Sequence, residues 1–197
     1  MRKIQFVNGD YYHVFNRGVE RRNIFASDSD RHYILSAFRK YETNSNGEKI
    51  VEINAFCLMN NHYHLHIRQL KDGGISRFMH RVFTAYVMYF NRRHARSGRL
   101  FESVFKAIPV VHDGQLAHLV RYIHLNPVQS MIEFGKLDTG SILQYAKTYR
   151  WSDCDQYIAG RGKLKCIFDD ISYSDYLSQG IAWKTGLTSS LSLNQPI

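Results

Sequence analysis

The sequence predicts an α+β domain on the split β-α-β plan, with an antiparallel sheet, helices on one of its faces and the other face open for a ligand. Three observations support this fold class. Strand and helix signals follow one another in the order β-α-β-β-α-β-α between residues 11 and 126. Two neighbouring strands are joined by only two residues, which indicates a hairpin. Two segments have apolar residues at helical spacing and supply the helices of the covered face.

The first half of the chain contains a strand, a helix and the hairpin. Residues 11–18, YYHVFNRG, combine aromatic and β-branched residues with an Asn-Arg-Gly stop, which is typical of a strand that ends in a turn. Residues 27–43 begin with Ser and Asp and continue with apolar residues at helical spacing, which predicts a helix. Residues 50–59 are mostly apolar and residues 62–70 alternate, so we expect two strands joined by the tight Asn-Asn connection.

The second half begins with one long helix. Apolar residues recur at helical spacing from Ile75 to about Arg96, and a glycine closes this stripe. Residues 100–111 are expected to be extended, and residues 113–126 to form a helix that the following proline ends. Beyond that point the signals weaken, and the region around residue 150 reads as loop and short helix.

Length and composition are those of one domain with a small addition. The chain has 197 residues, of which 44% are apolar, and this is enough to build a core. We assign residues 1–155 to one domain and expect residues 156–197 to be a C-terminal appendage that is partly flexible, because the last ten residues are polar and low in charge. No internal repeat is visible.

The charge balance is basic and leaves two interpretations open. Lys and Arg total 26 against 17 Asp and Glu, a formal net charge of +9, which suits nucleic acid or an anionic membrane surface and equally a plain solubility charge. Three cysteines provide neither an even disulfide framework nor a Cys-x-x-Cys pair. No stretch reaches the roughly 18 apolar residues of a membrane span. We expect an intracellular protein that does not enter membranes.

The second strand of the hairpin carries three histidines at alternate positions. In CLMNNHYHLHIRQL, residues 57–70, His62, His64 and His66 share one strand face, because side chains at i and i+2 point the same way about 6.5–7 Å apart. The residues between them are apolar or aromatic and are expected to face the helices. The histidines could simply be the solvated side of the strand, but three imidazoles in a row favour a ligand site.

A metal needs a further ligand, and the helix at residues 113–126 offers one. Tyr122 and Asn126 stand at i and i+4 on one helical face. Taken alone, the asparagine reads as a helix cap and the tyrosine as a core aromatic. Taken with the histidines, they suggest two imidazoles and an amide oxygen around Mg²⁺ or Mn²⁺, beside a phenol that attacks a phosphodiester. The absence of Walker, Gly-x-Ser-x-Gly and His-Glu-x-x-His motifs excludes the corresponding enzyme classes.

These residues resemble a known family. NHYHLHI, followed by a helix with RYIHLNPV, resembles the HUH single-tyrosine transposases, and YHVFNRG, RRNIF, NRRHARSGRLF and YRWS resemble the REP-associated tyrosine transposase branch. The resemblance covers roughly residues 10–153. It implies a ferredoxin-like palm that cuts single-stranded DNA, often beside a hairpin, and leaves a 5′-phosphotyrosine and a free 3′-hydroxyl.

The resemblance also implies a role for individual residues. It places the metal-binding histidine pair at His62 and His64, the third metal ligand at Asn126 and the nucleophile at Tyr122. His66 lies outside the family pattern and is expected to touch DNA. The chain departs from the family in MNNH, where Met-Pro-Asn-His is common, and at Glu102 and Val104, where Gln and Arg usually follow GRLF. These departures concern substrate choice and cutting efficiency.

Basic residues are concentrated on and after the long helix. From residue 68 to residue 106 there are nine Lys or Arg and only two acids, a pattern that suits a phosphate backbone better than a merely solvated helix face. Aromatic content of 14% would also suit stacking on unpaired bases, although most aromatics are expected in the core. The residues predicted to contact DNA are Arg77, Arg81, Arg92, Arg93, Arg96 and Arg99.

Three functions remain open at this point. The first is a metal-dependent enzyme that nicks and rejoins single-stranded or hairpin DNA through Tyr122. The second is a non-catalytic module that only grips single-stranded nucleic acid on the same fold. The third is a histidine-based metallohydrolase with a water nucleophile. The first predicts a bacterial, cytoplasmic protein associated with the nucleoid, either as a monomer or as a homodimer that exchanges the Tyr122 helix.

Overall fold

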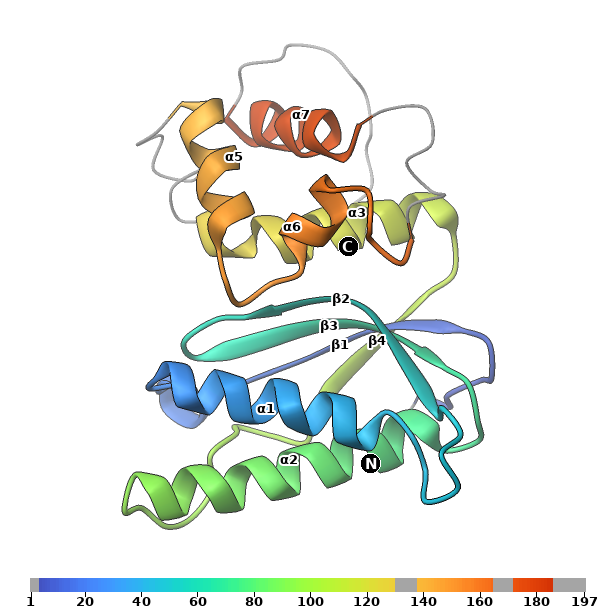
Figure 1. Ribbon diagram of the computed structural model, residues 1–197, viewed down its shortest axis with the longest axis vertical. Coiled ribbons are helices and arrows are strands. Elements are labelled where there is room, and N and C mark those ends of the chain that lie inside the picture. Colours follow the sequence, from blue (N-terminus) through green and yellow to red (C-terminus); the bar gives the residue numbers. More distant parts are fainter. Residues whose placement is uncertain (1–3, 130–137, 165–171, 186–197) are drawn as a thin grey trace.

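A four-stranded antiparallel sheet lies between two layers of helices (Figure 1). The computed structural model describes residues 4–129, 138–164 and 172–185. The sheet order is β2-β3-β1-β4, which is the split β-α-β arrangement, so the predicted fold class is confirmed. The elements follow the chain as β1 (Tyr11–Arg17), η1 (Val19–Arg21), α1 (Asp28–Tyr41), β2 (Val51–Leu58), β3 (His62–Gln69), α2 (Gly74–Arg93), β4 (Lys106–Val110), α3 (Asp113–Leu125), η2 (Asn126–Val128), α5 (Thr139–Thr148), α6 (Cys154–Ile158) and α7 (Tyr173–Thr185).

One face of the sheet is covered by α1 and α2, as expected (Figure 1). Tyr63, Leu65 and Ile67 of β3 are fully buried in this layer. A capping box at Ser27 and Asp30 starts α1, because the Ser27 hydroxyl accepts from the Asp30 backbone N–H and the Asp30 carboxylate accepts from that of Ser27. The alternation along β3 therefore assigns its apolar residues to this core and its histidines to the opposite face.

The opposite face differs from the expectation of an open surface. α3, α5, α6 and α7 form a second helical layer above it (Figure 1). Ala55 and Cys57 of β2 are small and fully buried, so they form a shallow surface on which the apolar stripe of α3 packs. The members of this second core are Ala55, Cys57, Leu116, Leu119, Val120, Ile123, Leu125, Val128, Ile142, Ala146, Cys154, Tyr157, Leu164, Tyr173, Leu177 and Ile181. This face stays accessible beside the first residues of β3 and along β4, where Lys106 and Ile108 are exposed.

The C-terminal part is more helical than predicted. α5 forms where the sequence signals weaken, α6 is a short helix in the region for which we expected loop and short helix, and α7 lies within the predicted appendage. Side chains from both sides of residue 155 share the second core, and we keep the division at that residue as a proposal. The flexible end expected near residue 190, and Cys166, lie outside the described residues. Cys57 and Cys154 are buried free thiols.

No helix in the described parts of the chain combines the length and apolar character needed to cross a membrane.

Candidate active site

The three predicted histidines follow one another along the face of β3 that looks toward α3. His62 begins the strand and is half-buried, whereas His64 is buried and only 6% exposed. The antiparallel register places Phe15 of β1 and Cys57 of β2 directly opposite His64. Residues opposite one another in such a ladder share a sheet face. The imidazoles therefore point to the side on which the second helical layer packs.

The end of α3 brings Tyr122 and Asn126 to this strand. His62 Nε2 lies 2.9 Å from Asn126 Oδ1, and the Tyr122 ring stands edge-on to the His64 ring with centroids 5.3 Å apart. A hydrogen bond also joins the side chains of Tyr122 and Asn126. The structure thus brings together the two histidines, the amide and the phenol that the sequence predicted for one site.

A third imidazole, which sequence reasoning missed, belongs to the same group. His13 comes from β1, and its Nε2 lies 2.9 Å from His64 Nδ1. Its ring also faces the edge of the Tyr122 ring, with centroids 6.0 Å apart. The sequence signal was a histidine at an alternating position of the first strand. Its place beside His64 can be seen only once the pairing of β1 with β3 is known.

His66 does not take the role that we expected for it. Its side chain has 0% exposure and stacks on Tyr11, with ring centroids 5.3 Å apart. Among the described residues, neither of its ring nitrogens has a hydrogen-bond partner. Because the His66 side chain is fully buried, it has no surface with which to touch DNA.

A pocket of about 420 Å³ opens beside the histidines. It contains three cations that are not among the six predicted DNA contacts, Arg17, Arg21 and Lys106. Glu102 holds two of them, with N–O distances of 2.5 Å to Arg17 and 3.6 Å to Lys106, and the bond from Arg17 lowers the pKa of Glu102. The lining residues are Phe15, Asn16, Arg17, Arg21, Asn61, His62, His64, Glu102, Lys106 and Tyr122.

Burial keeps the imidazoles of this site neutral near pH 7. It lowers the pKa of His13 to about 4, lowers that of His62 and lowers that of His64 well below its usual value. A neutral imidazole retains the lone pair that a metal requires. Burial raises the pKa of Tyr122, and its hydrogen bond with Asn126 opposes that rise. The phenol is therefore protonated in the absence of another cation.

The donor set fits a small divalent cation. His62 Nδ1 lies 2.7 Å from Asn61 Oδ1, so a neutral His62 that donates there directs the lone pair of Nε2 at the amide oxygen of Asn126. Two acceptors then face each other 2.9 Å apart. Adjacent ligands of an octahedral ion with bonds of about 2.0–2.1 Å are separated by about 2.9 Å. Within the described residues no group of three or more His, Cys, Asp or Glu could hold a metal, so the amide is essential to this donor set.

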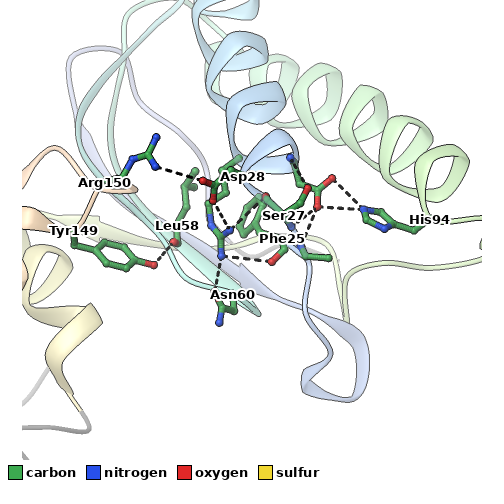
Figure 2. A network of polar contacts seen from close by, with 11 residues as sticks. Phe25, Ser27, Asp28, Leu58, Asn60, His94, Tyr149 and Arg150 are labelled. Atoms are coloured by element: carbon green, nitrogen blue, oxygen red, sulfur yellow. Dashed lines mark hydrogen bonds and ion pairs between the residues drawn. The ribbon is translucent and has the colours of Figure 1, made fainter.

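The Asn-Asn turn before His62 is anchored on the side of α1. Figure 2 shows Asn60 in a network with the start of α1, where Arg31 Nη2 donates to Asn60 Oδ1 at 2.5 Å. The Asn60 carbonyl accepts from the backbone N–H groups of Ile24 and Phe25 at 2.8 and 3.0 Å. Arg31 is buried and lies over the Trp151 ring at 5.3 Å. These contacts hold the turn where the family resemblance led us to expect a proline.

The predicted basic residues divide into two groups. Arg77 and Arg81 lie on α2, beneath the opposite face of the sheet, where Arg77 donates to the Asp72 carbonyl and Arg81 lies over the Tyr41 ring (Figure 1). The structure does not bring these two to the site. The others lie at the end of α2 or just after it, and none of them is among the residues that line the described pocket. This group comprises Arg92, Arg93, Arg96 and Arg99.

Comparison with known proteins agrees with this arrangement. The family model described as "Transposase IS200 like" matches residues 6–126, which contain the histidines, the phenol and the amide. No curated protein matches the chain. A solved REP-associated tyrosine transposase bound to a REP hairpin is 19% identical, with a TM-score of 0.53, over 81% of this chain and 84% of that chain, and it shares the fold.

A second solved structure comes from Deinococcus radiodurans R1 and is named provisionally as a transposase. It is 20% identical, with a TM-score of 0.38, over 62% of this chain and 95% of that chain. The family model spans more than half of the 197 residues and includes every residue of the candidate site. The chain therefore belongs to the IS200-like transposase family.

Proposed function

We propose that the chain cleaves and rejoins single-stranded DNA beside a hairpin, through a 5′-phosphotyrosine on Tyr122 and with Mg²⁺ or Mn²⁺ at His62, His64 and Asn126. The observation that carries this proposal is the meeting of the phenol, the two imidazoles and the amide at one pocket, with His62 Nε2 and Asn126 Oδ1 2.9 Å apart. The relative solved with a REP hairpin supports the choice of substrate class.

The covalent step exchanges one phosphodiester for another. Tyr122 Oη attacks the phosphorus, the P–Oη bond forms and the P–O3′ bond breaks. The proton that the phenol loses balances the proton that the leaving 3′-oxygen gains. A bound divalent ion would supply positive charge for the phosphate oxygens and favour the ionised phenol. Attack of a 3′-hydroxyl on the phosphotyrosine reverses these steps and rejoins a strand.

The chain's own residues orient the reacting groups. Asn126 contacts both His62 and Tyr122, so one amide sets the distance between the nucleophile and the ligand set. Arg17, Arg21 and Lys106 provide positive charge along the pocket wall for the phosphates next to the scissile one. All three protein ligands are neutral, so the DNA must supply the negative charge that balances the ion.

The test asks which end of the cut DNA strand becomes attached to the protein, and which residues this covalent adduct requires. Hairpin DNAs with single-stranded flanks are labelled at either end, incubated with the protein and Mn²⁺ and separated on a denaturing gel. A 3′ label should move with the protein, whereas a 5′ label should appear in a shorter free strand. Tyr122→Phe and His64→Ala should abolish both products, and Tyr145→Phe, an exposed tyrosine on α5, should retain them.

The other two functions give different results in the same experiment. Tight DNA binding without any adduct, across a broad set of hairpins, would leave the non-catalytic module as the better explanation. Hydrolysis that survives in Tyr122→Phe would identify a water nucleophile and thus the metallohydrolase.

Gel filtration of the same preparation with light scattering distinguishes a monomer from a homodimer.

A further inference from the structure

We infer that His13 is a positioning residue, which accepts a hydrogen bond from His64 Nδ1 and so presents His64 Nε2 to the divalent ion. This inference rests on the metal site of the proposed function. It concerns a residue on a different strand, which neither the sequence pattern nor the comparison with known proteins assigned. Its consequence is a defined tautomer for two neighbouring imidazoles.

The contact is specific and buried. His13 Nε2 and His64 Nδ1 are 2.9 Å apart, the two rings are tilted by only 23°, and both side chains are less than 10% exposed. Phe15 stacks on His13 with centroids 4.8 Å apart and limits its rotation. Because the pair is shielded from water, the hydrogen bond between the rings couples their tautomers: when one nitrogen carries the proton, the other must accept.

The two metal-binding histidines are supported in the same way. His62 Nδ1 lies 2.7 Å from Asn61 Oδ1, and His64 Nδ1 lies 2.9 Å from His13 Nε2. In each case a protein side chain engages Nδ1 and leaves Nε2 for an ion. Outer partners of this kind fix the tautomer and ring orientation of a ligating histidine, and their loss typically weakens metal binding about 10–100-fold.

The proton assignment follows from the ligand role. A neutral imidazole carries one proton, so His64 can offer the lone pair of Nε2 only when Nδ1 is protonated. That Nδ1–H donates to His13, whose Nε2 must then accept and whose own proton sits on Nδ1. His13 Nε2 is thereby engaged. His13 is also absent from the residues that line the pocket, so it acts through His64 and not on the substrate.

Two variants of His13 distinguish the effect of its hydrogen-bond acceptor from the effect of its ring shape. His13→Phe keeps an aromatic ring beside Phe15 but removes the acceptor, whereas His13→Gln restores an amide oxygen. Mn²⁺ affinity is measured in the presence of uncleavable hairpin DNA, from the free Mn²⁺ signal in electron paramagnetic resonance. We expect about 10–100-fold weaker binding in His13→Phe and a partial recovery in His13→Gln. His66→Phe, a buried histidine of the same face, should bind Mn²⁺ as the unchanged protein does.

A second measurement reads the tautomer without any cleavage. Two-bond ¹H–¹⁵N spectra of the histidine side chains, recorded with Mg²⁺ present, should show His64 protonated at Nδ1 and His13 protonated at Nδ1. Observation of His64 with its proton on Nε2 would overturn the inference, and so would unchanged Mn²⁺ affinity in a folded His13→Phe protein. If no DNA adduct forms while these results hold, the proposed chemistry fails and the positioning role stands.

Discussion

His124 Nε2 lies 2.9 Å from Asp153 Oδ1, and this contact joins α3 to the residue before α6. The other ring nitrogen, Nδ1, lies 2.5 Å from the hydroxyl of Tyr173 at the start of α7. Asp153 also accepts a hydrogen bond from the backbone N–H of Phe56 on β2, at 2.8 Å. A fully buried imidazole in the last turn of α3, between the two predicted site residues of that helix, thus ties the helix to β2 and to α7.

His124→Leu should therefore destabilise the fold. The substitution removes the imidazole that both the Asp153 carboxylate and the Tyr173 hydroxyl contact, and we expect the free energy of unfolding to fall by about 3 kcal/mol. Urea unfolding followed by circular dichroism measures the loss. Asp153→Asn keeps an oxygen for the Phe56 N–H and should lose less. A loss in His124→Leu no larger than that of Asp153→Asn would contradict the central position of the imidazole.

Asn126→Asp should change the affinity of the site for metal in the absence of DNA. The substitution replaces the neutral amide oxygen, 2.9 Å from His62 Nε2, by a charged oxygen, and hard cations bind carboxylates more tightly. We expect about tenfold tighter Mn²⁺ binding by titration calorimetry, and about tenfold weaker binding for Asn126→Ala. Equal affinities in the two variants would remove Asn126 from the ligand set.

Asn60→Ala should weaken the anchorage of the turn before His62. Arg31 is buried and donates to Asn60 Oδ1, so the substitution removes the acceptor of a charged donor and should cost about 2 kcal/mol. Thermal unfolding measures the stability, and the rate of adduct formation reports on the placement of His62. Asn46→Ala, in an exposed turn, serves as the control and should change neither. Unaltered stability in Asn60→Ala would mean that the two backbone bonds of the turn suffice.

Glu102→Gln should strengthen DNA binding. Glu102 pairs with Arg17 and Lys106 at the pocket, and its lowered pKa keeps it negatively charged near pH 7. Loss of this charge frees both cations for phosphates, and each new contact to single-stranded DNA should steepen the salt dependence of log K by about 0.7. Fluorescence anisotropy at several salt concentrations measures both effects. Glu48 pairs with Lys71 outside the pocket, so Glu48→Gln should leave the salt dependence of log K unchanged.

His66→Phe should stabilise the metal-free protein. The ring keeps its place on Tyr11, while two buried nitrogens without a hydrogen-bond partner in the described structure disappear, and this should add about 1 kcal/mol at pH 7. Urea unfolding in the presence of EDTA measures it. Lower stability in His66→Phe would contradict the absence of a polar partner for His66.

His66→Phe should also make the free energy of unfolding depend less on pH in the acid range. Burial, followed by the nearby His13, lowers the pKa of His66 to about 3, so between about pH 6.5 and pH 3 the unfolded chain binds a proton that the folded chain does not. The free energy of unfolding therefore falls as the pH falls through this window. Removal of the imidazole eliminates this contribution, and the unfolding midpoint in urea should depend less on pH. Identical pH profiles would show that His66 does not contribute.

The family and the first helical layer could be predicted because local patterns encode them. Alternation along β3 separates Tyr63, Leu65 and Ile67 from the histidines, and a stripe of apolar residues defines α2. The same patterns placed the imidazole pair on one strand face and Tyr122 and Asn126 on one helix face. Each of these groupings lies within a single element, where the spacing of residues along the chain fixes their direction.

The sequence by itself thus determined the fold class and the family, and it predicted the residues of the proposed ligand set. Only the tertiary structure decided what surrounds these residues. The pairing of β1 with β3 sets His13 against His64, and the layer of α3, α5, α6 and α7 buries His66. The chain after α2 also brings Glu102 into an ion pair with Arg17. These relationships join residues far apart in the chain. They follow from strand register and from packing between apolar faces, and neither leaves a periodic signal in a single segment.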